Sequence, residues 1–198
     1  MDVAGWDERY RSTDRLWSAE PNTFVAARLS DLEPGVGLDL ASGEGRNAIW
    51  LAERGWDMTA VDFSAVAAER GRQHSESVEF VVADVLTWEP DRHYDLVLIA
   101  YLHLDESEFE PLVRRVARWL LPGGELLMVG HDRSNLEHGV GGPPSPDVLW
   151  DVDQIVSWLE DVEIVEARVL EREVEGEERN ARDALVRARA AQERTRSS

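Results

Sequence analysis

A glycine-rich stretch at residues 38–48, LDLASGEGRNA, has residue types and spacing suited to binding a nucleotide. Gly43 and Gly45 follow a short apolar run, and glycines at such a turn let the backbone approach a ligand closely. Asp62 ends the next apolar run, where a carboxylate can accept hydrogen bonds from both hydroxyls of a ribose. The turn and the aspartate together predict a nucleoside-binding site.

The charge beside the turn distinguishes between nucleotides. Asp39 precedes Gly43 by four residues, so its carboxylate would repel the pyrophosphate that a dinucleotide places at this turn. A ligand with a sulfonium and an ammonium group would instead be attracted. Asp84 follows the third apolar run, within reach of an adenine amino group that needs an acceptor. These carboxylates favour S-adenosylmethionine (SAM) over NAD(P).

The composition excludes several other kinds of chemistry. The chain has 198 residues, of which 43% are hydrophobic and 31% charged, as in a single globular domain. Neither lysine nor cysteine occurs, which excludes Schiff-base chemistry, a P-loop lysine, disulfides and thiolate nucleophiles. The formal net charge of -19 disfavours polyanions such as nucleic acids. A small acceptor molecule is therefore expected.

From residue 36 onward, short apolar runs alternate with segments of helical length, which is typical of βα units and a parallel sheet. Asn22 and Ser64 are expected to cap helices, and Gly55 to end one. Two late segments, VEIVEARVL and DALVRARA, predict further strands. The second alternates apolar and charged residues, as an edge strand or an antiparallel strand would. The apolar runs are VGLDLA, MTAVDF, VEFVVADV, YDLVLIAYL and ELLMVG.

Five segments in order, LDLASGEGRN, TAVDFS, VVADV, YDLVLIAYLHL and LLPGGELLMV, resemble the motifs of class I SAM-dependent methyltransferases. The phrase GEGRNAIWLAERGW is similar to the small-molecule and tellurite-resistance branch of that family. The resemblance implies an α/β fold, Rossmann-like and doubly wound, with three α/β/α layers and a seven-stranded, mostly parallel sheet whose last strand is antiparallel. It also implies an N-terminal helical lid at 1–34, a methyltransferase domain at 35–191 and a flexible tail at 192–198.

The same resemblance implies a set of cofactor contacts at one edge of the sheet. Arg46 opens the helix after the turn and lies near the cofactor carboxylate or serves the structure alone. Trp17 would belong to the lid, and Ala100 or Tyr101 would line the sulfonium side. The methionine part would be held by Asp39, Ala41, Gly43 and Gly45, the ribose by Asp62, and the adenine by Phe63, Asp84 and Val85.

Two histidines follow the fourth and fifth apolar runs and so end at the same edge as Gly43. His103 and His131 could therefore supply a general base or contact the methyl acceptor. Alternatively, either one only caps a helix or holds a loop. A base is needed only where the acceptor is protonated at working pH. No metal site is expected, because His131 and His138 lack helical spacing in a glycine-rich loop.

The predicted function is transfer of a methyl group from SAM to an oxygen, sulfur or nitrogen atom of a small molecule by in-line displacement, with S-adenosyl-L-homocysteine as the product. The alternatives are a non-catalytic SAM-binding module and an NAD(P)-linked oxidoreductase. The lack of cysteine, of an apolar leader and of a long apolar run predicts a cytoplasmic protein. A monomer or homodimer without nucleic-acid or membrane partners is expected.

Overall fold

The computed structural model describes residues 2–13, 16 and 18–192. The chain divides into two compact units, Met1–Ala100 and Tyr101–Ser198. In the described part of the chain, no helix has the length and apolar character needed to cross a membrane.

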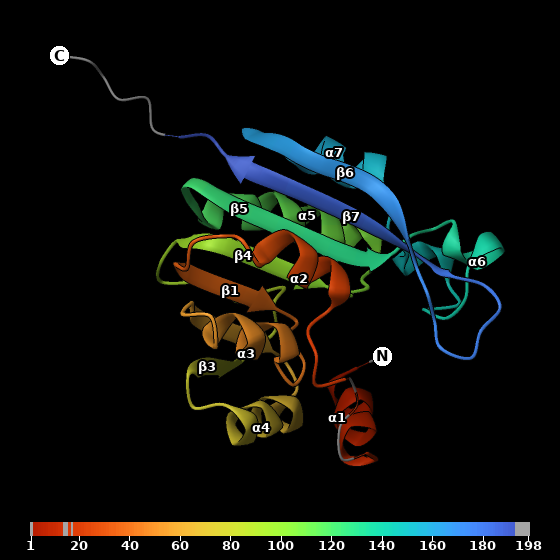
Figure 1. The fold of residues 1–198 in the computed structure, drawn as a ribbon, viewed down its shortest axis with the longest axis horizontal. Coiled ribbons are helices and arrows are strands. Elements are labelled where there is room, and N and C mark those ends of the chain that lie inside the picture. The colour runs from red at the N-terminus through yellow and green to blue at the C-terminus, as the bar shows by residue number, and fades with distance from the viewer. Residues whose placement is uncertain (1, 14–15, 17, 193–198) are drawn as a thin grey trace. The chain divides into compact units, whose positions relative to one another are not determined.

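The first unit contains four parallel strands in the order β3-β2-β1-β4, and Figure 1 labels three of them, β3, β1 and β4. The bounds are Val36–Leu40 for β1, Asp57–Asp62 for β2, Val78–Val82 for β3 and Tyr94–Ala100 for β4. The strands β1 and β4 are buried almost throughout. Continuous apolar runs are expected of such strands, because neither face of a central parallel strand meets water.

Helices of the first unit begin where the sequence predicts caps. The Asn22 side chain accepts hydrogen bonds from the amides of Phe24 and Val25 at the start of α2, and Ser64 Oγ accepts from the Ala67 amide at the start of α4. Gly55 adopts a left-handed conformation (φ +93°) after α3. The helices are α1 (Val3–Arg11), α2 (Thr23–Leu29), α3 (Arg46–Ala52) and α4 (Ala65–His74).

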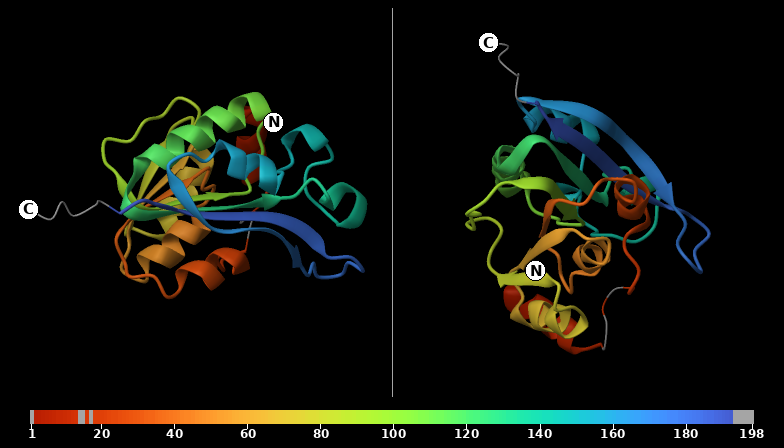
Figure 2. Two further views of the ribbon diagram at one scale, coloured as in Figure 1. Left: turned by 90° about the horizontal axis from the view of Figure 1, so that it is seen from above. Right: turned by 60° about the vertical axis from the view of Figure 1, so that its left-hand side comes forward.

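The second unit contains three antiparallel strands in the order β5-β7-β6, which run side by side in Figure 1. The strands are β5 (Leu120–His131), β6 (Val162–Arg172) and β7 (Ala181–Ala190), and a loop over 173–180 joins the last two at one end (Figure 2). Phe109 on α5 contacts the rings of Trp150 and Trp158. The helices are α5 (Glu106–Val116), α6 (Asn135–His138) and α7 (Val152–Trp158), with 3-10 turns at Ala117–Trp119 and Pro146–Val148.

The predicted fold class is confirmed: the chain has a Rossmann-like α/β fold with seven strands, mostly parallel in topology, flanked by helices, and the last strand is antiparallel. One of the two interpretations of the DALVRARA segment is wrong. This segment forms β7, which pairs with both β5 and β6 and is therefore not an edge strand. Its alternating charges are accommodated instead by ion pairs such as Arg187 with Glu125.

Close packing around Phe80 yields a stability prediction. A Cβ atom at Gly71 of α4 would overlap the Phe80 ring, so Gly71→Ala should overpack this site. Overpacking costs about 1–3 kcal/mol and the gain in helix propensity returns about 1 kcal/mol, so we expect a net loss of up to about 2 kcal/mol in the free energy of unfolding measured by urea denaturation. In a Phe80→Leu background the same substitution should no longer destabilise. Equal losses in both backgrounds would contradict the packing explanation.

Candidate functional site

The glycine turn predicted to bind a nucleotide follows β1 directly and is sharply bent. Three of its residues adopt left-handed backbone conformations: Ala41 (φ +54°), Gly43 (φ +57°) and Gly45 (φ +77°). A Cβ at Gly45 would lie 2.6 Å from the Phe80 ring, so this glycine is needed for packing whether or not a ligand binds. The turn is compact enough for backbone amides to face the end of β2.

Asp62 holds this turn in place. Its carboxylate accepts hydrogen bonds from the amides of Gly43 (2.8 Å) and Ser64 (2.9 Å), one on each oxygen. Burial raises the pKa of Asp62; the two amides lower it, and the nearby Asp7 carboxylate raises it further. Each carboxylate oxygen accepts more than one hydrogen bond, so Asp62 retains acceptor capacity for ribose hydroxyls.

Asp39, on β1, carries a carboxylate buried inside the first unit. It is 1% exposed, and neither carboxylate oxygen has a hydrogen-bond partner among the described residues. Burial raises its pKa to about 7, against the opposing effects of the Ala48 amide and the Arg46 guanidinium; Asp62 raises it further. A buried, unpartnered carboxylate suits a cationic ligand group, which would compensate the charge. This observation fits the amino-acid end of SAM.

The residues predicted to contact adenine lie after β2 and β3. Phe63 is half-buried, Val85 is buried and Asp84 is exposed. β3 ends at Val82, so Asp84 lies two residues beyond the strand, where its Oδ1 accepts a hydrogen bond from the Leu86 amide. Asp84 and Phe63 are thus accessible for an adenine ring.

Three further residues, Ala100, Trp17 and Arg46, are predicted to contact the cofactor. Ala100 is the last residue of β4 and is half-buried. Trp17 lies outside the described residues. The Arg46 guanidinium donates a hydrogen bond to Ser18 Oγ at 3.1 Å and interacts electrostatically with Asp39.

The sequence analysis missed one polar residue of the glycine turn, Glu44. Glu44 is buried, accepting hydrogen bonds from the Leu16 amide (3.0 Å) and from Arg70 (3.2 Å). Asn47 Oδ1 accepts from the Asn22 amide at 2.9 Å. Together with the Arg46–Ser18 contact, these bonds fasten the leading segment to the turn. The only signal in the sequence was a carboxylate between two glycines.

The second unit contains both predicted catalytic histidines in one aromatic cluster. The rings of His103 and His131 stack with centroids 5.5 Å apart, and Tyr101 lies edge-on to His131 at 5.1 Å. His103 Nδ1 lies 2.9 Å from the Val148 carbonyl, which can only accept, so the proton resides on Nδ1. Burial lowers the pKa of His103 to about 4, and its Nε2 has no partner in the described structure. His103 is therefore a neutral acceptor.

His131 contacts a carboxylate that the sequence analysis did not single out. Its Nδ1 lies 3.1 Å from Oδ1 of Asp183 on β7, and His131 and Asp183 are paired in the β5–β7 register. The Asp183 side chain is fully buried. The neighbouring Asp132 instead accepts hydrogen bonds from Ser134, so it does not orient His131.

The long glycine-rich loop packs against this histidine cluster. A Cβ at Gly142 would lie 2.8 Å from the His131 ring, and Gly142 has φ +77°. The Trp150 indole donates a hydrogen bond to the Leu102 carbonyl at 2.9 Å and lies 6.0 Å from the His103 ring. The cluster is thus walled by Trp150 and by the loop backbone.

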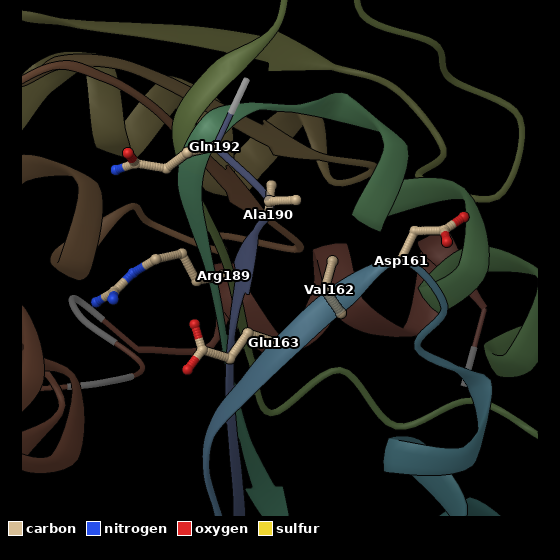
Figure 3. A pocket seen from close by; sticks show the side chains of 7 residues that line it. Asp161, Val162, Glu163, Arg189, Ala190 and Gln192 are labelled. Carbon is tan, nitrogen blue, oxygen red and sulfur yellow. The ribbon is translucent and has the colours of Figure 1, made fainter. Parts of the chain in front are cut away.

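The second unit also has a hollow of about 650 Å³ (Figure 3). It is lined by Asp161, Val162, Glu163, Arg189, Ala190, Ala191 and Gln192. Val162 and Glu163 lie at the start of β6 and Arg189 and Ala190 at the carboxyl end of β7, whereas Asp183 lies near the amino end of β7. Six residues of strand separate Asp183 from Arg189, or roughly 20 Å. The hollow contains no histidine and belongs to a different part of the strand pair.

Comparisons with known proteins agree with the motifs. Residues 38–124 match a family described as "Methyltransferase domain". The chain is 33% identical over 132 residues to a demethylmenaquinone methyltransferase of Thermus thermophilus. The aligned region covers 61% of this chain and 60% of that relative. The chain thus corresponds to less than two thirds of that relative's length.

Solved structures share the fold. TehB from Haemophilus influenzae has a TM-score of 0.74 at 18% identity, over 93% of this chain and 67% of that one. NodS is an N-methyltransferase from Bradyrhizobium japonicum WM9 solved with S-adenosyl-L-homocysteine. It has a TM-score of 0.69 at 19% identity, and the match covers 96% of this chain and 99% of NodS. The resemblance to class I SAM-dependent methyltransferases is confirmed.

The raised pKa of Asp39 predicts a pH-dependent stability. Its folded-state pKa of about 7 exceeds the ordinary value of 3.8, so the folded chain binds the proton more tightly and loses stability as pH rises between these values. We expect Asp39→Asn to flatten the fall in unfolding free energy between about pH 4 and pH 8 in urea titrations.

A matched control is Asp91→Asn, which alters an exposed carboxylate of the same unit and should leave the slope unchanged. If the unfolding free energy falls equally with pH in the Asp39→Asn variant and in the unmodified chain, Asp39 is not the group that causes the pH dependence.

Proposed function

We propose that this chain, which resembles class I SAM-dependent methyltransferases in its motifs, its family match and its fold, transfers a methyl group from SAM to a small molecule. The observation that carries the proposal is the buried, unpartnered carboxylate of Asp39 beside the glycine turn. A dinucleotide would bring a pyrophosphate toward this charge, whereas SAM brings a cation.

The residues assigned to the cofactor follow from the chemistry of each part. Asp39 would compensate the ammonium group, with Ala41, Gly43 and Gly45 providing a closely approaching backbone. Asp62 would accept from the ribose hydroxyls, and Phe63, Asp84 and Val85 would surround the adenine; Ala100 would line the sulfonium side. When bound, SAM supplies a methyl carbon activated by positive sulfur.

The leading segment is proposed to cover the cofactor site. Three hydrogen bonds fasten it to the turn, from Leu16 to Glu44, from Arg46 to Ser18 and from Asn22 to Asn47. Asp7 on α1 also accepts a hydrogen bond from Ser64 Oγ, next to Asp62. We infer a lid within residues 1–34, preceding the methyltransferase domain at 35–191.

The acceptor is proposed to be a small molecule that meets His103 and His131. His103 Nε2 is buried without a hydrogen-bond partner among the described residues, and the His131 side chain keeps 14% of its surface exposed. The relative from Thermus thermophilus is named for demethylmenaquinone, a small molecule, which supports this class. The net charge of -19 disfavours nucleic acid, and we propose a cytoplasmic monomer or homodimer.

Calorimetry with SAM, S-adenosylhomocysteine and NAD tests the cofactor assignment. We expect SAM to bind and NAD to give no signal. Asp62→Asn should weaken SAM binding by about 1–3 kcal/mol, a roughly 5- to 150-fold rise in Kd, because the amide cannot accept all the hydrogen bonds of the carboxylate. Asp57→Asn, at the other end of β2, is the matched control. Tight NAD binding without SAM binding would refute the assignment.

Catalysis is tested separately by turnover. The protein is incubated with SAM and a panel of phenols, amines, thiols and short carboxylic acids, and S-adenosylhomocysteine is quantified. Formation of a methylated product well above the rate without acceptor would support the enzyme. SAM binding without turnover of any acceptor class would favour the non-catalytic binding module instead.

A further inference from the structure

Asp183 is a fully buried carboxylate that the proposed function leaves without a role. A buried charge is costly unless it is paired and hydrogen-bonded. Here the Oδ2 atom accepts hydrogen bonds from Arg172 Nε (2.8 Å) and from the Tyr101 hydroxyl (2.9 Å). Burial alone would raise the pKa of Asp183, but His131 and Arg172 lower it below its usual value. Asp183 is therefore ionised.

The second oxygen of Asp183 faces His131. Because Arg172 and Tyr101 both donate to Oδ2, Oδ1 remains for His131 Nδ1 at 3.1 Å. The contact has ion-pair distance without ideal hydrogen-bond alignment, as catalytic contacts often have before substrate binds. A carboxylate only accepts, so it favours the proton on Nδ1 and leaves a lone pair on Nε2.

The His131 ring has little freedom to turn away from Asp183. One face stacks on His103 (17° between planes), Tyr101 lies edge-on, and the backbone of Gly142 closes against the ring. The β5–β7 register also places His131 directly opposite Asp183. No described residue provides a partner for Nε2, and the His131 side chain keeps 14% of its surface exposed. Nε2 is thus available to a ligand.

We propose that Asp183 is a positioning residue that holds His131 as the Nδ1-protonated tautomer, so that His131 Nε2 removes a proton from the methyl acceptor. This inference rests on the proposed function and deepens it by naming the acceptor class. Arg172 and Tyr101 act through Asp183 by fixing the orientation of its carboxylate. The same arrangement of histidine and buried aspartate orients the base in the serine hydrolases.

Methyl transfer and proton transfer would occur together at the acceptor atom. The acceptor lone pair forms a bond to the methyl carbon, the bond from that carbon to sulfur breaks with its electron pair going to sulfur, and the acceptor proton moves to His131 Nε2. The resulting imidazolium is stabilised by Asp183 and later releases its proton to water. A base of this kind serves an acceptor that carries an O–H or N–H proton. A ready-made anion such as a thiolate gains nothing from it.

Asp183→Asn provides a specific test. Arg172 can only donate, so it would hold the carbonyl oxygen of the new amide and turn the NH₂ group toward His131. His131 Nδ1 would then have to accept, and its proton would move to Nε2. We expect ¹⁵N chemical shifts of the imidazole, in the uniformly labelled full chain near pH 8.5, to show this exchange of tautomer. The spectrum of His131→Gln assigns the signals among the five histidines.

Glu125→Gln is the matched control. Glu125 is also a buried carboxylate held by two arginines, Arg187 and Arg189, and its loss costs stability without touching the histidines. The imidazole ¹⁵N signals of His131 in the Glu125→Gln variant should match those of the unmodified protein. An unchanged His131 tautomer in a folded Asp183→Asn variant would overturn the proposal.

Turnover gives a second readout with a pair of acceptors. Near pH 8.5 a simple phenol keeps its proton, whereas 4-nitrophenol is already ionised. We expect Asp183→Asn to lower kcat on phenol by about 100-fold or more and to lower kcat on 4-nitrophenolate by less than about 5-fold, with KM little changed for either. Equal losses of kcat on the two acceptors would overturn the proposal.

These readouts separate this inference from the proposed function. If neither phenol is methylated, the imidazole spectra still decide the role of Asp183, whereas SAM calorimetry decides the cofactor assignment. SAM binding should be equal in Asp183→Asn and the unmodified protein, because the variant changes no residue assigned to the cofactor.

Discussion

The burial of one uncompensated carboxylate governs the chemistry of the first unit. β1 lies between β2 and β4, and this pairing places Asp39 where water cannot reach it. Folding must therefore either protonate Asp39 or leave a buried charge, and both cost free energy. A cationic ligand group, as proposed for this site, would lower that cost by adding a positive charge beside the carboxylate.

The turn next to Asp39 contacts Phe80, the leading segment and Asp62. Gly45 makes room for Phe80, and Glu44 and Asn47 accept hydrogen bonds from the leading segment. Gly43 donates its amide to Asp62, the residue assigned to the ribose. Because the same few residues shape the turn, bind the Asp62 carboxylate and attach the leading segment, a change in any one of them should affect all three.

The pKa values of two buried aspartates are shifted in opposite directions by their surroundings. Asp39 lacks a partner and has a raised pKa, whereas Asp183 has Arg172, Tyr101 and His131 around it and a lowered pKa. The first environment fits the binding of a cation. The second keeps an ionised carboxylate 3.1 Å from His131 Nδ1, the position from which we propose that it sets the tautomer of this histidine. Carboxylates whose pKa values are pushed apart by their surroundings are a recurrent sign of divided roles in enzymes.

The sequence alone determined the parallel strands of the first unit, the caps at Asn22 and Ser64, and the positions of Asp39 and Asp62, because each depends on local spacing. It also indicated His103 and His131, since the ends of predicted strands are readable. Only the tertiary structure decided that β7 inserts between β5 and β6 and brings Asp183 opposite His131. Register between strands distant in the chain depends on which faces pack together, and no local pattern around Asp183 encodes it.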